Sequence, residues 1–180
     1  MITLQKAFKQ SKTQVLSWVQ SSPFSHYYEL RCGKQISGYL IWKKDNFSIS
    51  GMGATNQGSW NFKFTRYIQP GLEIQEATSS LSAGIFHLDW SGRGQLALSD
   101  GQIFDWLPGD RWGKDWQFNH SSRIPLLYFQ LHKKWLTIDA QIQATHETPG
   151  EPALSLMVLS GWFYLALNSA GKQTGILLNQ

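Results

Sequence analysis

The sequence predicts a mostly β protein, a closed barrel of about twelve strands with a C-terminal hydrophobic helix through its centre. Short segments of alternating or aromatic character recur along the chain and are separated by turn residues, as in a barrel or sandwich. The run EPALSLMVLSGWFYLALNS, residues 151–169, is apolar on all sides, so a helix there must be surrounded. A barrel of a dozen strands is too wide for its wall side chains alone to fill. We therefore expect the barrel to enclose the helix and the helix to fill the barrel.

The composition fits one domain of moderate charge. The chain has 180 residues, of which 42% are hydrophobic and 14% aromatic, and aromatic residues favour strands and supply large buried areas. The net charge of +4 permits anionic partners without predicting them. The lone Cys32 excludes an internal disulfide framework, and residues 1–20 contain no apolar signal-peptide core. We therefore expect a cytoplasmic protein.

The start of the chain differs from the rest. Apolar residues recur near helical spacing and lysines lie between them, at Leu4, Phe8, Val15 and Val19 and at Lys6, Lys9 and Lys12. The pattern predicts an amphipathic helical segment over residues 1–22, followed by a single barrel domain over 23–180. The helix is expected to plug or cover one end of the barrel. The alternative is a basic helix that lies on a membrane surface.

The first strands are read from turns and alternation. YYELRC and ISGYLIWK flank Gly33-Lys34, which suits a hairpin turn, and NFSISGM follows. In SWNFKFTRY the aromatic residues alternate with polar ones, at Trp60, Phe62 and Phe64 against Asn61, Lys63 and Thr65. This period of two predicts one buried and one exposed face. The short runs GMG (51–53) and GRG (92–94) are interpreted as turns or bulges.

The remaining strands follow in the same way. LEIQEA, AGIFHLDW, QLALS and QIFDWL are expected strands, with SGRG as one turn and Asp100-Gly101 as the strongest hairpin signal. DWQFNH, LLYFQLH and WLTIDAQI complete the series.

The apolar run predicts a helix over residues 152–167. Glu151 and Pro152 suit a first helical turn, and Asn168, Ser169 and Gly171 end it. A helix of this length covers roughly 22 Å, whereas a bilayer core is about 30 Å thick. We therefore expect no transmembrane span. A glycine within the helix, Gly161, would let the barrel wall approach closely.

Three stretches together resemble a known superfamily. GQLALSDGQIFDW (94–106), DWQFNHSSRIPLLYFQ (115–130) and EPALSLMVLSGWFYLAL (151–167) resemble small bacterial members of the tubby C-terminal-like superfamily, which includes plant LURP-one-related proteins and the phospholipid scramblases. The resemblance covers about residues 26–178 and implies a barrel with the helix along its axis. The phosphoinositide-binding basic pair of tubby and the calcium-binding segment of scramblases have no counterpart on named residues. The resemblance therefore implies neither activity here.

The sequence offers no catalytic or metal-binding motif. Five histidines occur singly, at His26, His87, His120, His132 and His146. His87 and Asp89 share one strand face and could supply two metal ligands, although such pairs are mostly solvated. Cys32 lies at the end of an aromatic strand beside Gly33 and is expected to be a buried structural thiol rather than a nucleophile. We expect no catalytic residue, no cofactor and no metal.

The loop DWLPGDRWGKDW, residues 105–116, is the candidate contact surface. Trp106 and Trp116 are expected to point from strands into the core. The remaining Arg111, Trp112 and Lys114 combine an aromatic ring with two cations, which suits an anionic or interfacial surface.

Two functions remain open from the sequence. The first is a non-enzymatic binding module that meets anionic lipid head groups or a protein partner at the barrel rim, with peripheral membrane contact at most. The alternative is a lipocalin-like carrier or enzyme for a small apolar ligand, which requires an open barrel interior. A nucleic-acid partner is not expected.

Overall fold

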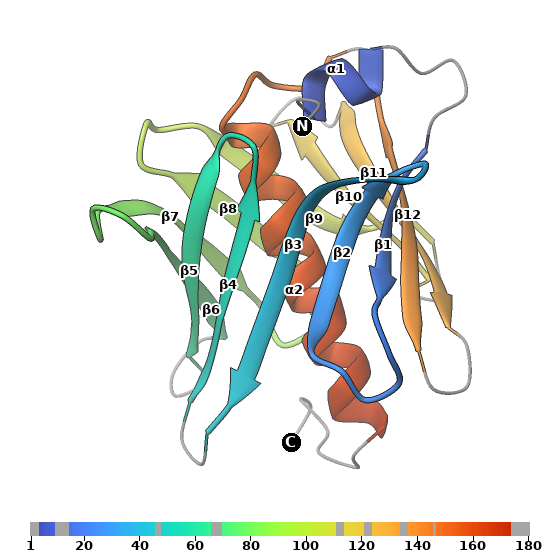
Figure 1. Ribbon diagram of the computed structural model, residues 1–180. Coiled ribbons are helices and arrows are strands. Elements are labelled where there is room, and N and C mark those ends of the chain that lie inside the picture. The colour runs from blue at the N-terminus through green and yellow to red at the C-terminus, as the bar shows by residue number, and fades with distance from the viewer. Residues whose placement is uncertain are drawn as a thin grey trace.

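The protein is a closed antiparallel barrel around a helix (Figure 1). The computed structural model describes residues 4–9, 15–45, 48–65, 70–110, 114–120, 124–133, 137–145 and 147–173. In this part of the chain each strand pairs with its neighbour in sequence, and β1 closes the barrel on β12 through Leu16 and Ile142. This confirms the predicted fold class.

The strands run up and down around the barrel, and two helices flank them in sequence. The elements are α1 (Leu4–Lys9), β1 (Leu16–Gln20), β2 (Tyr27–Cys32), β3 (Gln35–Lys44), β4 (Ile49–Thr55), β5 (Gly58–Thr65), β6 (Gly71–Glu76), β7 (Ser82–Leu88), β8 (Gly94–Leu98), β9 (Ile103–Pro108), β10 (Asp115–His120), β11 (Pro125–Lys133), β12 (Ile138–Ala144) and α2 (Ala153–Gln173). Gly33 and Gly101 adopt φ values of +59° and +88°, in the two turns that the sequence indicated as hairpins.

The N-terminal segment differs from the prediction. The helix α1 ends at Lys9, and Leu16–Gln20 form the first barrel strand, so the predicted helical segment to residue 22 is wrong over this stretch. Leu16 and Trp18 are both fully buried, whereas the residues after each of them are only half-buried. This period of two is that of a strand. The barrel therefore begins at Leu16, not at residue 23.

The helix α2 lies inside the barrel and is longer than predicted. It has 21 residues and continues past residue 167 to Gln173. Its segment Ala153–Ala170 has a mean hydropathy of 1.4, which by length and composition is enough to cross a membrane, so the length argument from the sequence is wrong. However, 89% of this segment is buried within the protein. Enclosure by the barrel, rather than by lipid, accounts for its apolar surface.

Aromatic contacts join the helix to the wall on several sides. Trp162 stacks on Trp18 of β1 with ring centroids 5.7 Å apart, and it meets the ring of Tyr28 edge-on at 5.4 Å. Phe163 stacks on Phe62 of β5 at 5.4 Å. Offset and edge-on ring pairs of this kind stabilise cores beyond the effect of buried area.

Glycines set how closely the wall and the helix approach. A Cβ atom added at Gly161 would lie 2.8 Å from Phe129 Cζ, so this position admits no larger residue without movement. On β4, a Cβ at Gly53 would lie 2.8 Å from Leu159, and one at Gly51 would collide with Phe163. The run GMG is therefore the middle of a strand rather than a turn or bulge.

Replacement of Gly161 by alanine tests the enclosure of the helix. In a free helix Gly→Ala stabilises by about 1 kcal/mol, whereas overpacking a core costs about 1–3 kcal/mol. Because the two effects oppose each other, we expect Gly161→Ala to lower the free energy of unfolding by up to about 2 kcal/mol in denaturant titrations. Gly150→Ala is the control, because nothing lies within 4 Å of its added Cβ. A more stable Gly161→Ala protein would contradict the packing described.

Candidate functional site

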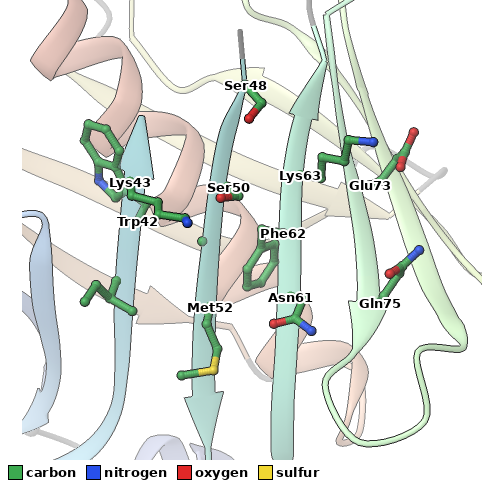
Figure 2. Close-up of a pocket in the computed structure, with 12 residues that line it drawn as sticks. Trp42, Lys43, Ser48, Ser50, Met52, Asn61, Phe62, Lys63, Glu73 and Gln75 are labelled. Atoms are coloured by element: carbon green, nitrogen blue, oxygen red, sulfur yellow. The ribbon is translucent and has the colours of Figure 1, made fainter. Parts of the chain in front are cut away.

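The outer face of the barrel carries a hollow of about 600 Å³ over β3, β4, β5 and β6 (Figure 2). Ligand pockets typically enclose about 300–1,000 Å³. The hollow, called the outer groove below, is lined by Ile41, Trp42, Lys43, Ser48, Ser50, Gly51, Met52, Asn61, Phe62, Lys63, Glu73 and Gln75. It lies on the outside of the sheet, because α2 occupies the inside.

Strand register arranges the outward side chains of the groove in two parallel rows. Direct cross-strand neighbours form the first row, Lys43, Ser50, Lys63 and Glu73, and the second row, Ile41, Met52, Asn61 and Gln75. Figure 2 shows both rows projecting from the four strands on one side of the sheet. The first row is therefore charged and hydroxylic, and the second begins with two apolar side chains.

The hollow follows from the small residues of β4. Gly51 and Gly53 face inward and let this strand lie against Phe163 and Leu159 of the helix. The outward residues of β4 include only short side chains besides Met52, whereas longer side chains rise from β3 and β5 on either side. The outer surface along β4 is therefore recessed between the longer side chains of β3 and β5.

The apolar part of the groove is accessible to solvent. Ile41 is 44% exposed, and Met52 beside it is half-buried. Trp42 and Phe62 line the groove from the inner layer and are almost fully buried. A ligand in the groove would therefore meet an apolar surface that water now covers.

The charges of the groove are open to a ligand. Lys43 Nζ lies 3.9 Å from an Asp45 carboxylate oxygen, and both side chains are exposed. A pair at this distance in solvent holds its partners weakly. Lys63 extends toward Glu73, its neighbour on β6 (Figure 2). Among its lining residues the groove thus has two ammonium groups and one carboxylate.

Of the three predicted contact residues, the structure describes Lys114, which lies outside this groove. Arg111 and Trp112 lie outside the described residues. Lys114 is exposed just before β10, and its backbone N–H donates to Asp110 Oδ1 at 2.8 Å. As predicted, Trp106 and Trp116 point into the core, where their rings stack at 5.2 Å. Lys114 does not line the outer groove, which lies on β3–β6.

The Asp89 carboxylate is held by the backbone of its own turn. His87 is exposed on β7, whereas Asp89 Oδ1 accepts hydrogen bonds from the N–H groups of Ser91 and Arg93 at 2.8 and 3.0 Å and from the Ser91 hydroxyl at 2.6 Å. Partial burial acts to raise the pKa of Asp89, but these bonds and the Arg93 charge outweigh it and lower that pKa. No group of three His, Cys, Asp or Glu side chains in the described ranges is arranged to hold a metal ion.

A second hollow of about 480 Å³ marks the barrel end where α2 begins. Beside it a hydrogen-bond chain ties the helix to β4. Ser155 Oγ donates to Glu151 Oε2 at 2.6 Å and lies 3.0 Å from Thr55 Oγ1. Because the Ser155 proton goes to Glu151, Thr55 is the donor in the second bond. These three side chains tie the start of α2 to β4, while Glu151 Oε1 is buried and has no hydrogen-bond partner among the described residues.

Sequence reasoning missed the outer groove. Its position depends on the register of four strands. The alternation in β5 and the small residues of β4 carried the relevant signal, but only the pairing of Ser50 with Lys43 and Lys63 brings the row together.

The turn at Asp89 leads to a pH-dependent prediction. Its folded-state pKa is lowered from 3.8, so the ionised carboxylate contributes stability at neutral pH that is lost as the pH falls through that pKa. We expect Asp89→Asn to reduce the free energy of unfolding at pH 7 by less than about 1 kcal/mol, because the turn is exposed. Denaturant titrations should show the deficit shrinking below about pH 4. A deficit of equal size at pH 7 and pH 3 would assign it to something other than the charge.

Comparisons of this chain with protein-family models, with curated proteins and with solved structures found no match. The tubby-like resemblance therefore stays a prediction, and the candidate site stands on its own geometry.

Proposed function

We propose that the protein is a non-enzymatic binding module whose outer groove takes an anionic amphiphile, a molecule with one anionic head group and an apolar tail. One observation carries this proposal. The register places the row with Lys43, Ser50 and Lys63 directly beside the row with Ile41 and Met52. A surface suited to an anionic head group and a surface suited to an apolar tail therefore lie side by side in the outer groove.

The first row suits a phosphate or carboxylate. Lys43 and Lys63 flank Ser50 on neighbouring strands, so two ammonium groups and a hydroxyl can donate to the same anion. Charge-assisted hydrogen bonds of this kind are stronger than neutral ones. Ser48 lines the groove as well and adds a second hydroxyl.

The second row suits an apolar chain. Burial contributes about 0.8 kcal/mol per methylene group, whereas an exposed ion pair contributes about 0.2–1 kcal/mol. A tail of several carbons lying on Ile41 and Met52 would therefore supply most of the affinity. The lysines would supply the preference for negative charge. The flexible side chain of Met52 can adapt to tails of different shape.

The filled interior favours an outer site. The carrier alternative required an open barrel, and Trp162 and Phe163 of α2 are fully buried within it. A ligand inside would have to displace the helix. The anionic head group is shared with the lipid-binding expectation from the sequence, but the proposed contact lies on β3–β6 rather than at the 105–116 loop.

Calorimetric titration with decyl phosphate tests the proposal. We expect saturable binding of one molecule, no comparable binding of decyltrimethylammonium, and roughly tenfold weaker binding of decyl phosphate by Lys43→Ala/Lys63→Ala, from the loss of two charge-assisted bonds. Lys34→Ala is the matched control, because Lys34 is an exposed lysine in the β2–β3 turn.

A steric variant separates the groove from general electrostatics. Ser50→Leu keeps both lysines but fills the part of the outer groove that lies between them, so it should also abolish the binding of decyl phosphate. The proposal is wrong if decyl phosphate does not bind, if both amphiphiles bind equally, or if Lys34→Ala weakens binding as much as the groove variant does.

A further inference from the structure

Two connections at one end of the barrel hold large aromatic side chains in solvent. Because consecutive strands are antiparallel, the β1–β2 and β7–β8 connections lie at the same end, which is also where α2 ends (Figure 1). Phe24 in the first connection is 77% exposed, and Trp90 in the second is 61% exposed. We call this end the aromatic end.

The turn that carries Trp90 is fixed from two sides. Asp89 binds the N–H groups of Ser91 and Arg93, which closes the turn around the tryptophan. Gly92, with φ of +84°, lies against the Tyr164 hydroxyl of the central helix, where no Cβ would fit. Trp90 is thus presented to solvent on a rigid base. A partner that binds it has little ordering entropy to overcome.

The loop that carries Phe24 is also ordered. Gln20 Nε2 donates to the Ser25 carbonyl at 2.7 Å, and Gln20 Oε1 accepts from the Ile138 N–H at 3.0 Å, so the loop is tied to β12. Phe24 itself adopts φ of +63°, a conformation that is unfavourable for a residue with a Cβ. Its ring gains no burial that would offset this. A left-handed phenylalanine kept in solvent indicates a contact made outside the chain.

Basic side chains at the aromatic end face solvent, and two of the acidic side chains bind backbone N–H groups. Arg93, Lys44 and Lys114 are exposed. The carboxylates of Asp89 and Asp110 accept hydrogen bonds from backbone N–H groups of their own turns. The Asp45 carboxylate in the β3–β4 connection also faces solvent at this end, where it pairs with Lys43.

We propose that the aromatic end docks on the surface of an anionic lipid bilayer. Strands β1 and β7 are separated by half of the twelve-stranded ring, so the Phe24 and Trp90 turns lie on opposite sides of the barrel. A flat surface can meet both. Aromatic rings favour the interface between head groups and acyl chains, and the exposed cations favour anionic lipid.

In the docked orientation one end of the outer groove would lie close to the membrane, but docking does not require the groove to bind a ligand. Lys43 lies near the end of β3, and Ser48 lies in the connection that follows, which is at the aromatic end. The lysine end of the groove would then lie near the head groups. The docking proposal stands on Phe24, Trp90 and the exposed cations, whether or not the groove binds a ligand.

Vesicle co-sedimentation tests the docking. The probes are vesicles of phosphatidylcholine alone and of phosphatidylcholine mixed with phosphatidylserine. We expect the wild-type protein to sediment with the mixed vesicles, and Phe24→Ser/Trp90→Ser to lower the partition coefficient about tenfold or more. The control Ile36→Ser/Leu81→Ser removes two exposed apolar side chains, 48% and 66% exposed, from the opposite end of the barrel, one at the start of β3 and one in the β6–β7 connection. It should bind as the wild type does.

Two further variants test the contribution of the cations and the contact of Trp90 with lipid separately. Lys44→Ala/Lys114→Ala should weaken the dependence on phosphatidylserine and on salt. Trp90→Phe should still bind, but with less fluorescence quenching by brominated lipid than the wild type shows, and this readout does not require a large loss of binding. Thermal unfolding of each variant checks that it is folded.

The outcomes separate this proposal from the groove. Loss of vesicle binding in Phe24→Ser/Trp90→Ser with unchanged decyl phosphate binding supports docking at the aromatic end. The proposal is overturned if the wild type sediments with neither vesicle, or if the Ile36 and Leu81 control loses binding equally. It is also overturned if the aromatic variant changes only the oligomeric state in vesicle-free solution, which would make the surface a contact between two copies of this chain.

Discussion

The structure depends on the mutual burial of one helix and one barrel. The helix α2 has no polar face along Ala153–Leu167, and a twelve-stranded ring encloses more space than its inward side chains can fill. Each would be unstable in water alone. Their contact is made by large rings on most sides and by glycine at the closest approaches, as at Gly161 and Gly53. The interior is therefore a packed core rather than a container.

This internal contact also shapes the external surface. The inward glycines of β4 draw that strand toward the helix, and the outer groove lies where β4 recedes between its neighbours. At the aromatic end, Gly92 packs against Tyr164 of α2. Burial and the nearby Asp89 charge raise the pKa of Tyr164 to about 12, so its side chain stays a neutral phenol. The Trp90 turn and the groove are thus both supported by the same helix. A change in the packing of α2 would therefore affect both surface features.

Local patterns predicted most of the fold. Alternation at Trp60, Phe62 and Phe64 indicated which face of β5 is buried, and the apolar run at 151–169 indicated an enclosed helix. The same reasoning failed where a pattern was short or ambiguous. Val15 and Val19 continue the near-helical spacing of Leu4 and Phe8 and so favour a helix where the structure has the strand Leu16–Gln20. The two glycines of GMG favour a turn or bulge where the structure has the middle of β4. The groove was not predictable, since it is created by the pairing of residues from four strands whose register no single segment specifies.

The order of the elements along the chain has a consequence for synthesis. The barrel closes only when β1 pairs with β12, and the helix that fills it follows β12 in sequence. A nascent chain on the ribosome must therefore carry β12 before the barrel can close, and α2 before the barrel can be filled. During that time the aromatic inner faces and the open sheet edges lack their final partners, and such surfaces are prone to aggregation. The first strands therefore wait for the helix that fills the barrel until β12 has been made.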